Sequence, residues 1–317
     1  MNTASIKCFA LAVLAILTSG AVSAQAADIL PPPERVSENV YAWIGPLDGP
    51  NTQNQGYRMN LAFVVGTDAV AVFDTGYTRE MGDEMIAHIK RVTALPIRYA
   101  INSNSQPHRY FGNDAFHAIG AEIMATPEEL ARMEGMGGMF AMFSAQALGL
   151  KDGAVPAPIA PVQKVTSSRT LDLGGGITLR ILPAGGNHTP NSLIADVPSD
   201  KVLLAGDVLY GERLLAVLDV SQPKEWIDTF DGLRRFKDYL FVPGHGRPGP
   251  LAIFEGPTYR YLSNIWDYMC KAVGAGVDLD SAVKSYDQSA YSGLVNFDNL
   301  SGRNASWTYQ KAEFACF

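Results

Sequence analysis

The sequence of 317 residues contains little cysteine, and this shortage limits its covalent cross-links. Three cysteines are present, of which Cys8 falls in a segment that we expect to be removed, so the mature chain can form at most one intramolecular disulfide. The remaining pair is Cys270 and Cys316. The sequence does not supply the Cα separation that a disulfide requires, so two interpretations stay open. Either a bridge attaches the C-terminus to a helix, or both thiols are buried and unpaired.

Concentrated positive charge and long hydrophobic runs are also missing. The net charge is −7, the pI is about 5.3, and no run of lysine and arginine occurs. Nucleic acids and anionic membranes both require such a run, so neither is an expected partner. No segment after residue 26 approaches the ~20 apolar residues of a transmembrane helix. We therefore expect a small-molecule substrate or ligand, with no membrane association after removal of the leader.

The first 26 residues have the pattern of a secretory signal peptide. Lys7 precedes an apolar run over residues 9–17, and small residues follow at 22–26. The apolar run is too short to span a bilayer. The pattern predicts a signal peptide over residues 1–26 and a periplasmic or secreted mature protein.

Strand-like and helix-like stretches alternate along the rest of the chain, which predicts an α/β sandwich. With 47% hydrophobic residues the chain can bury a large core, and we expect one domain over residues 28–250 with a helical C-terminal extension over 251–317. Predicted strands cover residues 40–44, 61–65, 69–73, 97–101, 169–173, 177–182, 193–197, 202–204 and 239–242; predicted helices cover 78–92, 114–119, 223–236, 279–286 and 304–311.

Three separated segments each place one metal-ligand residue on a glycine-marked turn after an apolar run. The ligand residues are His188 in Gly186-Asn187-His188-Thr189-Pro190, Asp207 in Ala205-Gly206-Asp207, and His245 in Val242-Pro243-Gly244-His245-Gly246. Neutral imidazole and carboxylate suit zinc and related divalent ions. The pattern therefore predicts a metal site built from loops, in which Asp207 could bridge two ions.

Together with Phe73-Asp74-Thr75-Gly76 and the segment 102–113, these motifs resemble the metallo-β-lactamase superfamily in order and spacing. The resemblance implies two packed mixed sheets with outer helices, and zinc-dependent hydrolysis of a small ester, thioester or lactone. Asp207 fits the general hydrolases of the superfamily better than the β-lactamases that carry cysteine there. The helical tail, with Arg303-Asn304 and Tyr309, resembles exported members associated with periplasmic quinoprotein oxidation systems. A periplasmic dehydrogenase system is therefore a possible partner.

The chain departs from the family motif at the positions that normally hold the metals. The family's His-x-His-x-Asp-His motif corresponds without a gap to Asn104, Gln106, His108 and Arg109. Amide oxygens are weak zinc ligands, so the first metal site should be empty or marginal. For the second site, His108, Asp207 and His245 supply three ligands. We therefore expect a zinc occupancy of one ion at most, or none.

Arg109 leaves two functions open, because a guanidinium cannot coordinate a metal and repels a dication. In the first, one ion is retained and the protein is a metal-dependent hydrolase with an altered site, in which His108 and Asp207 take catalytic roles. In the second, Arg109 pairs bidentately with Asp207 in a metal-free cleft. The protein would then be a catalytically inactive pseudoenzyme that acts as a binding or accessory protein.

Other residues have smaller expected roles. Asp74 resembles a family position that orients the histidine loop through hydrogen bonds, although a simple turn cap is an equal alternative. Tyr210, Glu212 and Arg213 follow Asp207 closely enough to line the pocket. Methionines recur over residues 133–142, and we expect flexible hydrophobic packing there in preference to copper ligands.

Overall fold

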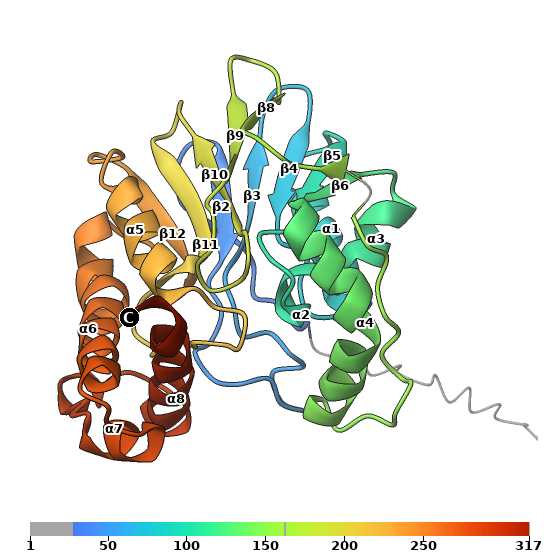
Figure 1. Ribbon diagram of the computed structural model, residues 1–317. Coiled ribbons are helices and arrows are strands. Elements are labelled where there is room, and N and C mark those ends of the chain that lie inside the picture. Colours follow the sequence, from blue (N-terminus) through green and yellow to red (C-terminus); the bar gives the residue numbers. More distant parts are fainter. Residues whose placement is uncertain (1–27, 162, 317) are drawn as a thin grey trace, which may run out of the picture.

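The computed structural model describes residues 28–161 and 163–316, and it forms two packed β-sheets with helices on their outer faces (Figure 1). The predicted α/β sandwich is therefore confirmed, including the helical C-terminal extension. The predicted signal peptide lies outside the described residues. Among the helices of the described part, none combines the length and apolarity needed to cross a membrane.

The first sheet has seven strands whose spatial order follows the chain. Its first four strands pair antiparallel and the strands from β4 onward pair parallel. The strands are β1 (Glu34–Arg35), β2 (Val40–Trp43), β3 (Leu61–Val65), β4 (Val70–Phe73), β5 (Ile97–Ile101), β6 (Glu122–Ala125) and β7 (Gln163–Lys164).

The second sheet has five strands in the order β12-β11-β10-β9-β8. Only β11 and β12 pair parallel, and the other neighbours are antiparallel. The strands are β8 (Arg169–Asp172), β9 (Thr178–Pro183), β10 (Leu193–Val197), β11 (Val202–Tyr210) and β12 (Leu240–His245).

Helices cover the outer face of each sheet (Figure 1). Those of the first half of the chain are α1 (Arg79–Val92), α2 (Pro107–Tyr110), α3 (Asn113–Ala118) and α4 (Pro127–Ala147). Those of the second half are α5 (Pro223–Leu233), η1 (Leu251–Phe254), η2 (Glu255–Arg260), α6 (Tyr261–Gly274), α7 (Leu279–Ser285), η3 (Ser289–Tyr291) and α8 (Phe297–Ala315).

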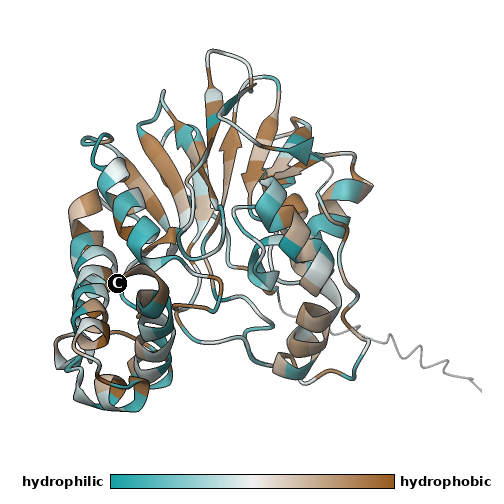
Figure 2. Cartoon of the chain, in the orientation of Figure 1, coloured by the Kyte–Doolittle hydropathy of each residue, from teal (hydrophilic) through white to brown (hydrophobic). Residues whose placement is uncertain are grey.

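The strand sequences explain why the molecule is layered. In β3, Ala62 and Val64 pack between the two sheets, whereas Leu61 and Phe63 pack on the opposite face. Alternate side chains of a strand point to opposite faces, so a strand that is apolar at every position must be covered on both sides. Figure 2 shows these apolar strands enclosed between helices that carry hydrophilic residues on their outer faces.

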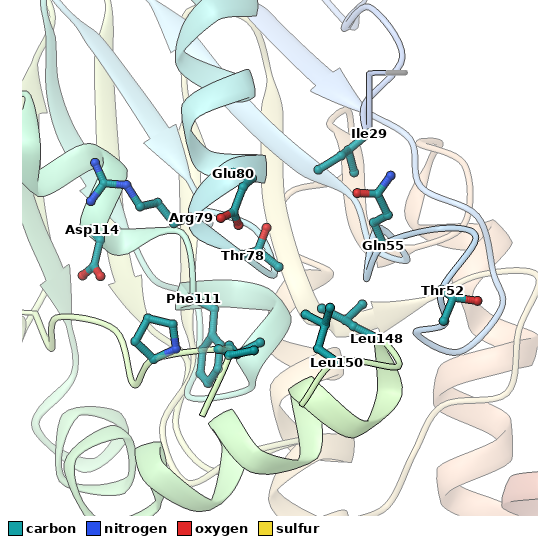
Figure 3. Close-up of a pocket in the computed structure, with 13 residues that line it drawn as sticks. Ile29, Thr52, Gln55, Thr78, Arg79, Glu80, Phe111, Asp114, Leu148 and Leu150 are labelled. Atoms are coloured by element: carbon teal, nitrogen blue, oxygen red, sulfur yellow. The ribbon is translucent and has the colours of Figure 1, made fainter. Parts of the chain in front are cut away.

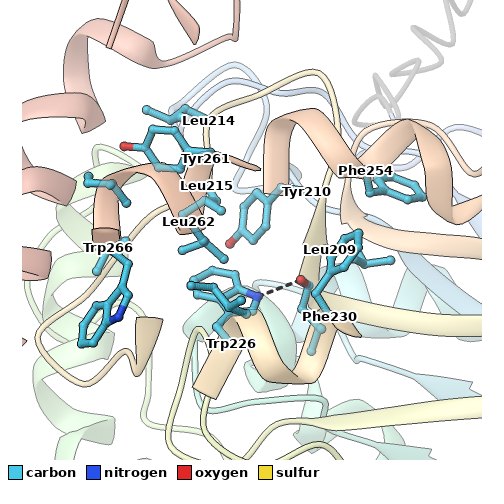
Figure 4. Packing of buried hydrophobic residues seen from close by; sticks show 14 of the residues in the cluster. Leu209, Tyr210, Leu214, Leu215, Trp226, Phe230, Phe254, Tyr261, Leu262 and Trp266 are labelled. Atoms are coloured by element: carbon cyan, nitrogen blue, oxygen red, sulfur yellow. Dashed lines mark hydrogen bonds between the residues drawn. The ribbon is translucent and has the colours of Figure 1, made fainter. Parts of the chain in front are cut away.

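Helices α5 and α8 pack into the hydrophobic core beside the second sheet. Trp226 of α5 is fully buried and donates from Nε1 to the carbonyl of Val208 at 2.8 Å (Figure 4). Asn304 of α8 is also buried; its Oδ1 accepts from Val217 N at 2.8 Å and its Nδ2 donates to Leu215 O at 2.8 Å. These bonds fix α8 against the segment that follows β11.

The methionine-rich segment lies within the 21-residue helix α4, which is not among the helices predicted from the sequence. Thr126 caps the helix by accepting from Glu129 N, and Pro127 occupies the first turn. Three interior glycines cost about 1 kcal/mol each, more than one cap returns, so packing of the buried face of α4 must supply the rest. Met133 is buried whereas Met139 and Met142 are exposed, so only part of the methionine-rich segment packs in the core.

Cys270 of α6 and Cys316 after α8 form a disulfide across a sequence separation of 46 residues. We expect Cys270→Ser/Cys316→Ser to lower the free energy of unfolding by about 2–4 kcal/mol, since the bridge restricts the unfolded chain. Denaturant unfolding measures this difference. Reductant should lower the stability of the wild type and leave that of the double variant unchanged; equal stability of the two proteins under oxidising conditions would contradict the prediction.

Candidate functional site

The predicted site residues gather where strands of both sheets end. Asp74 directly follows β4 and the segment 102–106 follows β5, and these two strands are parallel neighbours. Asp207 lies within β11, and His245 is the last residue of its parallel neighbour β12. Parallel neighbours present their carboxyl ends at the same edge, which brings residues distant in sequence into one cleft.

Arg109 of α2 lies at the centre of this cleft and is completely buried. Its Nε donates to Asp207 Oδ2 at 2.9 Å, and its Nη2 donates to Asp207 Oδ1. Nη1 donates to Asp74 Oδ2 at 3.0 Å. The carbonyls of Asn60 and Gly244 accept from Nη1 and Nη2 at 2.9 and 3.1 Å. All five N–H groups of the guanidinium are therefore satisfied.

The surrounding chain is shaped to admit this side chain. A Cβ on Gly244 would overlap Asp207 Oδ1 and lie 2.6 Å from Arg109 Nη2, so only glycine leaves room here. Asn60 is 4% exposed and donates from Nδ2 to the carbonyls of Pro243 and Gly246, at 2.9 and 2.7 Å. These bonds attach the start of β3 to the turn that carries His245.

The two carboxylates respond differently to Arg109. Burial by itself would raise the pKa of Asp207, but the adjacent guanidinium outweighs it and holds this pKa well below its ordinary value. Asp74 is equally buried and shares Arg109 through one contact, and its desolvation raises its pKa to about 6. Asp207 is therefore the principal counterion of Arg109.

Asp74 makes the contacts expected of a residue that orients the histidine loop. Its Oδ1 accepts from Ser103 N at 2.7 Å and its Oδ2 accepts from Ser103 Oγ at 2.9 Å. Its backbone has a φ of 66°, in the left-handed region. Both features hold the chain after β5 against the chain after β4.

The three cleft histidines have different surroundings. His108 Nε2 lies 3.4 Å from Asp207 Oδ2, and His245 Nε2 lies 3.3 Å from Asp207 Oδ1. Ligand atoms of these three residues all lie within 4.8 Å of one another. His188 stands apart from this group; its Nδ1 donates to the carbonyl of Ala216 at 2.8 Å, which leaves Nε2 without a hydrogen-bond partner among the described residues.

The two amides that replace family histidines do not form a ligand pair. Asn104 donates from Nδ2 to Asp207 Oδ2 at 2.9 Å, while its Oδ1 accepts from the backbone N of Gln106 at 2.9 Å. Both ends of the Asn104 amide are therefore occupied. Gln106 instead lines a cavity beside His188 and His245.

These contacts test whether the residues suit zinc. Zinc would require an oxygen of Asp207 at about 2.0–2.2 Å. Both of these oxygens already accept from Arg109, and Asn104 donates to one of them. A dication at His108, Asp207 and His245 would have to displace a guanidinium that is fully buried and bonded to both oxygens of Asp207. The donor set is assembled, but its electrostatics do not fit a tightly bound ion.

The two histidines outside the motifs, His88 and His117, lie away from the cleft. His88 is buried and its Nδ1 accepts from Trp43 Nε1 at 3.1 Å. In the neutral ring Nε2 then carries the proton, so this atom does not coordinate a metal despite its nearness to Glu84 and Asp28. His117 is exposed on α3.

Two cavities accompany the cleft. One of about 340 Å³ is lined by Gln106, His188 and His245, and Arg58, Arg213 and Arg303 also face it. The larger, of about 410 Å³, is lined by apolar side chains that include Phe111, Leu148 and Leu150, and none of the predicted site residues borders it (Figure 3). The smaller cavity therefore belongs to the candidate site, although it is not the larger of the two.

Sequence reasoning missed Asn60 and Arg58 and named Arg213 only from its position after Asp207. Tyr210 and Arg213 do line the smaller cavity, whereas Glu212 is exposed and accepts from Arg247 N at 3.0 Å. The only available signal for Asn60 was a polar residue immediately before the buried strand β3.

The fold and cleft define a class of α/β protein in which loops at strand ends assemble a metal or ligand site. The protein-family model that describes the metallo-beta-lactamase superfamily matches residues 56–245, which is more than half of the chain. The chain therefore belongs to this superfamily. A metallo-beta-lactamase from Pontibacter korlensis is similar in structure, with a TM-score of 0.57 and 18% identity over 73% of this chain and 98% of the other. VMB-1, in a crystal structure at pH 5.5, gives a TM-score of 0.56 and 17% identity over 72% and 94%. At this level of identity, the two similarities show a shared fold and nothing about activity.

Because its cleft histidines are buried and resist protonation, the metal-free protein should lose stability in acid. Burial lowers the pKa of His108 to about 3 and that of His188 to about 4, and it places that of His245 well below its ordinary value. The unfolded chain takes up these protons below about pH 6.5 and the folded chain does not. The free energy of unfolding should therefore fall as the pH drops from 6.5 to 4, by up to about 1.4 kcal/mol per pH unit for each histidine.

Asp74, whose raised pKa is about 6, opposes this trend because the folded chain binds its proton first. His188→Asn keeps a donor for Ala216 O and should reduce the slope by about 1.4 kcal/mol per pH unit. Denaturant titrations between pH 4 and 7 in the presence of a chelator measure the slope. The exposed His117→Asn serves as the control, and an unaltered slope in His188→Asn would refute the assignment.

Proposed function

We propose that this member of the superfamily uses its cleft to bind a small molecule and that an arginine–carboxylate centre stands where a hydrolase would hold its metals. One observation carries the proposal: Arg109 is fully buried, and both oxygens of Asp207 accept from it. The carboxylate that would bridge two ions is thereby already neutralised. The protein is then a pseudoenzyme with a binding or accessory role.

Electrostatic magnitudes support this choice. Two unit charges 4 Å apart interact by about 4 kcal/mol at an effective dielectric of ~20, and a dication doubles the repulsion from Arg109. Asn104 and Gln106 offset little of this repulsion, because their amide oxygens are weaker zinc ligands than the two imidazoles they replace. One zinc ion at most, weakly held, is the occupancy we propose.

The cellular setting is proposed from the sequence. The pattern of residues 1–26 supports export to the periplasm or beyond. Resemblance of the helical tail to quinoprotein-associated members supports an accessory role in a periplasmic oxidation system.

A hydrolase with one zinc ion is the second candidate. It is favoured by the proximity of His108, Asp207 and His245, whose ligand atoms lie within 4.8 Å of one another. Its substrate would be a small ester, thioester or lactone. Release of Asp207 from Arg109 would have to accompany metal binding.

Zinc content separates the two candidates. After loading with zinc and gel filtration, we expect well under one ion per chain by elemental analysis, because Arg109 occupies the shared carboxylate. One retained ion per chain, with esterase activity that a chelator abolishes, would favour the hydrolase. Two retained ions would show that Asn104 and Gln106 do not disable the first site.

Arg109→His tests the electrostatic argument directly. The substitution removes a permanent cation and adds a ligand, so the affinity for zinc should rise by at least about tenfold, measured by competition with a chromophoric chelator. Without metal the variant should lose about 3–5 kcal/mol of stability, because two buried carboxylates lose their counterion, and zinc should restore part of it. The exposed Arg98→His adds an imidazole outside the cleft and should change neither quantity. An affinity no higher than that of the wild type would remove the claim that Arg109 opposes the metal.

A further inference from the structure

The smaller cavity is lined by three arginines from three separate elements. Arg58 precedes β3, Arg213 follows β11, and Arg303 lies on α8. Among the described residues that line it, none is aspartate or glutamate. The net charge of the whole chain is −7, so this concentration of positive charge is a local exception.

Arg213 is buried without the partners that a buried cation normally has. Its exposed fraction is 3%, and its Nε has no hydrogen-bond partner in the described part of the chain. Its Nη1 lies 3.4 Å from Nδ1 of His245, but that atom also lies 2.8 Å from the carbonyl of Arg58. A carbonyl only accepts, so the shorter contact assigns the proton to Nδ1 and leaves Arg213 facing another donor.

Arg58, which lines the same cavity, resembles Arg213 in this respect. Its Nε is buried and unpartnered, and neither Arg58 nor Arg213 pairs with a carboxylate within residues 28–161 and 163–316. Desolvation lowers the pKa of both, that of Arg213 to about 10, and their mutual repulsion adds to the lowering for Arg213. A guanidinium is not deprotonated in proteins, so both arginines carry their charge at neutral pH. Asp207, the acidic residue of the cleft, is already paired with Arg109.

His188 adds an acceptor to the same cavity. Its Nδ1 donates to Ala216 O, so in the neutral ring Nε2 carries a lone pair, and this atom is buried and unpartnered among the described residues. The cavity therefore offers guanidinium donors together with one imidazole acceptor. A small acid that also carries a hydroxyl group complements this set.

We infer that the cavity binds a small oxyanion, a carboxylate or a phosphate, whose oxygens are held by Arg58 and Arg213, while Arg303 attracts it from the exposed side. Guanidinium groups bind carboxylate and phosphate through paired N–H donors, which makes arginine suited to this task. The volume of about 340 Å³ admits a small organic acid or phosphate ester. This inference rests on the proposed function in one respect: the anion meets arginines and not a metal ion.

The test is ligand-dependent thermal stability of the metal-free protein. Sodium phosphate and sodium citrate are each compared, at low millimolar concentration, with sodium chloride at equal ionic strength. A ligand that binds the folded state raises the unfolding temperature, and at such concentrations the general stabilisation by excluded salts is small. We expect at least one of the two anions to raise it above the chloride value. Phosphate alone would identify a phosphate site, and citrate alone a carboxylate site. No rise with either would overturn the inference.

Matched variants assign the binding to the cavity. Arg213→Met and Arg58→Met should each lower the affinity for the anion by at least about tenfold, measured by titration calorimetry, since each removes charge-assisted hydrogen bonds. Arg98→Met removes one exposed arginine elsewhere and should bind as the wild type does. Undiminished binding in both cavity variants, or an equal loss in Arg98→Met, would overturn the assignment.

Stability without the anion provides a second readout. Arg213→Met should unfold at the same temperature as the wild type or at a higher one, because it removes a desolvated, repelled cation. A large drop would indicate a structural arginine and contradict the inference. Zinc content measured on the same samples keeps the two proposals separable, since stoichiometric zinc would refute the pseudoenzyme while the arginine variants still decide the anion site.

Discussion

The ion pair between Arg109 and Asp207 is the contact on which the arrangement of the cleft depends. Arg109 also binds Asp74 and the carbonyls of Asn60 and Gly244, so one side chain joins the ends of β4, β11 and β12 and the start of β3. Buried pairs of this kind add little net stability relative to apolar packing, but loss of one partner is costly. The pair therefore fixes the geometry of the strand ends more than it stabilises the fold.

The same pair redistributes the charge of the cleft. A metal centre would supply several positive charges near Asp207, and here one comes from Arg109 in direct contact and others from Arg58, Arg213 and Arg303 around the adjoining cavity. Against these stand Asp207 and Asp74, and burial raises the pKa of Asp74 to about 6. A cleft without an ion can thus remain positive. Attraction for anionic small molecules does not require the metal.

Much of the fold could be predicted from the sequence, because apolar periodicity determines which segments become strands. The predicted strands at residues 61–65 and 193–197 coincide with β3 and β10. By contrast, β11 continues past the predicted end at 204 to Tyr210, since Gly206, with a φ of 51°, allows an irregularity within the strand. Helix α4 was missed because its glycines resemble a loop, whereas the signals that start it lie at Thr126 and Pro127.

The candidate site was predictable to the extent that its residues lie in recognisable motifs. The contact of Arg109 with Asp207 follows from placing a guanidinium at a ligand position, and it was one of two interpretations. The sequence could not select between them, because the choice depends on side-chain direction and on the space left by Gly244. Arg58 could not be found at all, since its significance arises only when the segment before β3 meets the segment after β11.

Arg109 and Arg213 are both almost fully buried, but their surroundings require different explanations. Every N–H of Arg109 has an acceptor, so the scaffold itself accounts for that arginine. Arg213 has an unpartnered Nε, a histidine donor nearby and no carboxylate of its own among the described residues. Desolvating an unpaired cation costs several kcal/mol, and the attraction of Asp207 offsets this only in part, since the pKa of Arg213 stays lowered. Such a residue has N–H groups free for an interaction that the described chain does not make, and an oxyanion is the partner whose charge and geometry would complete it.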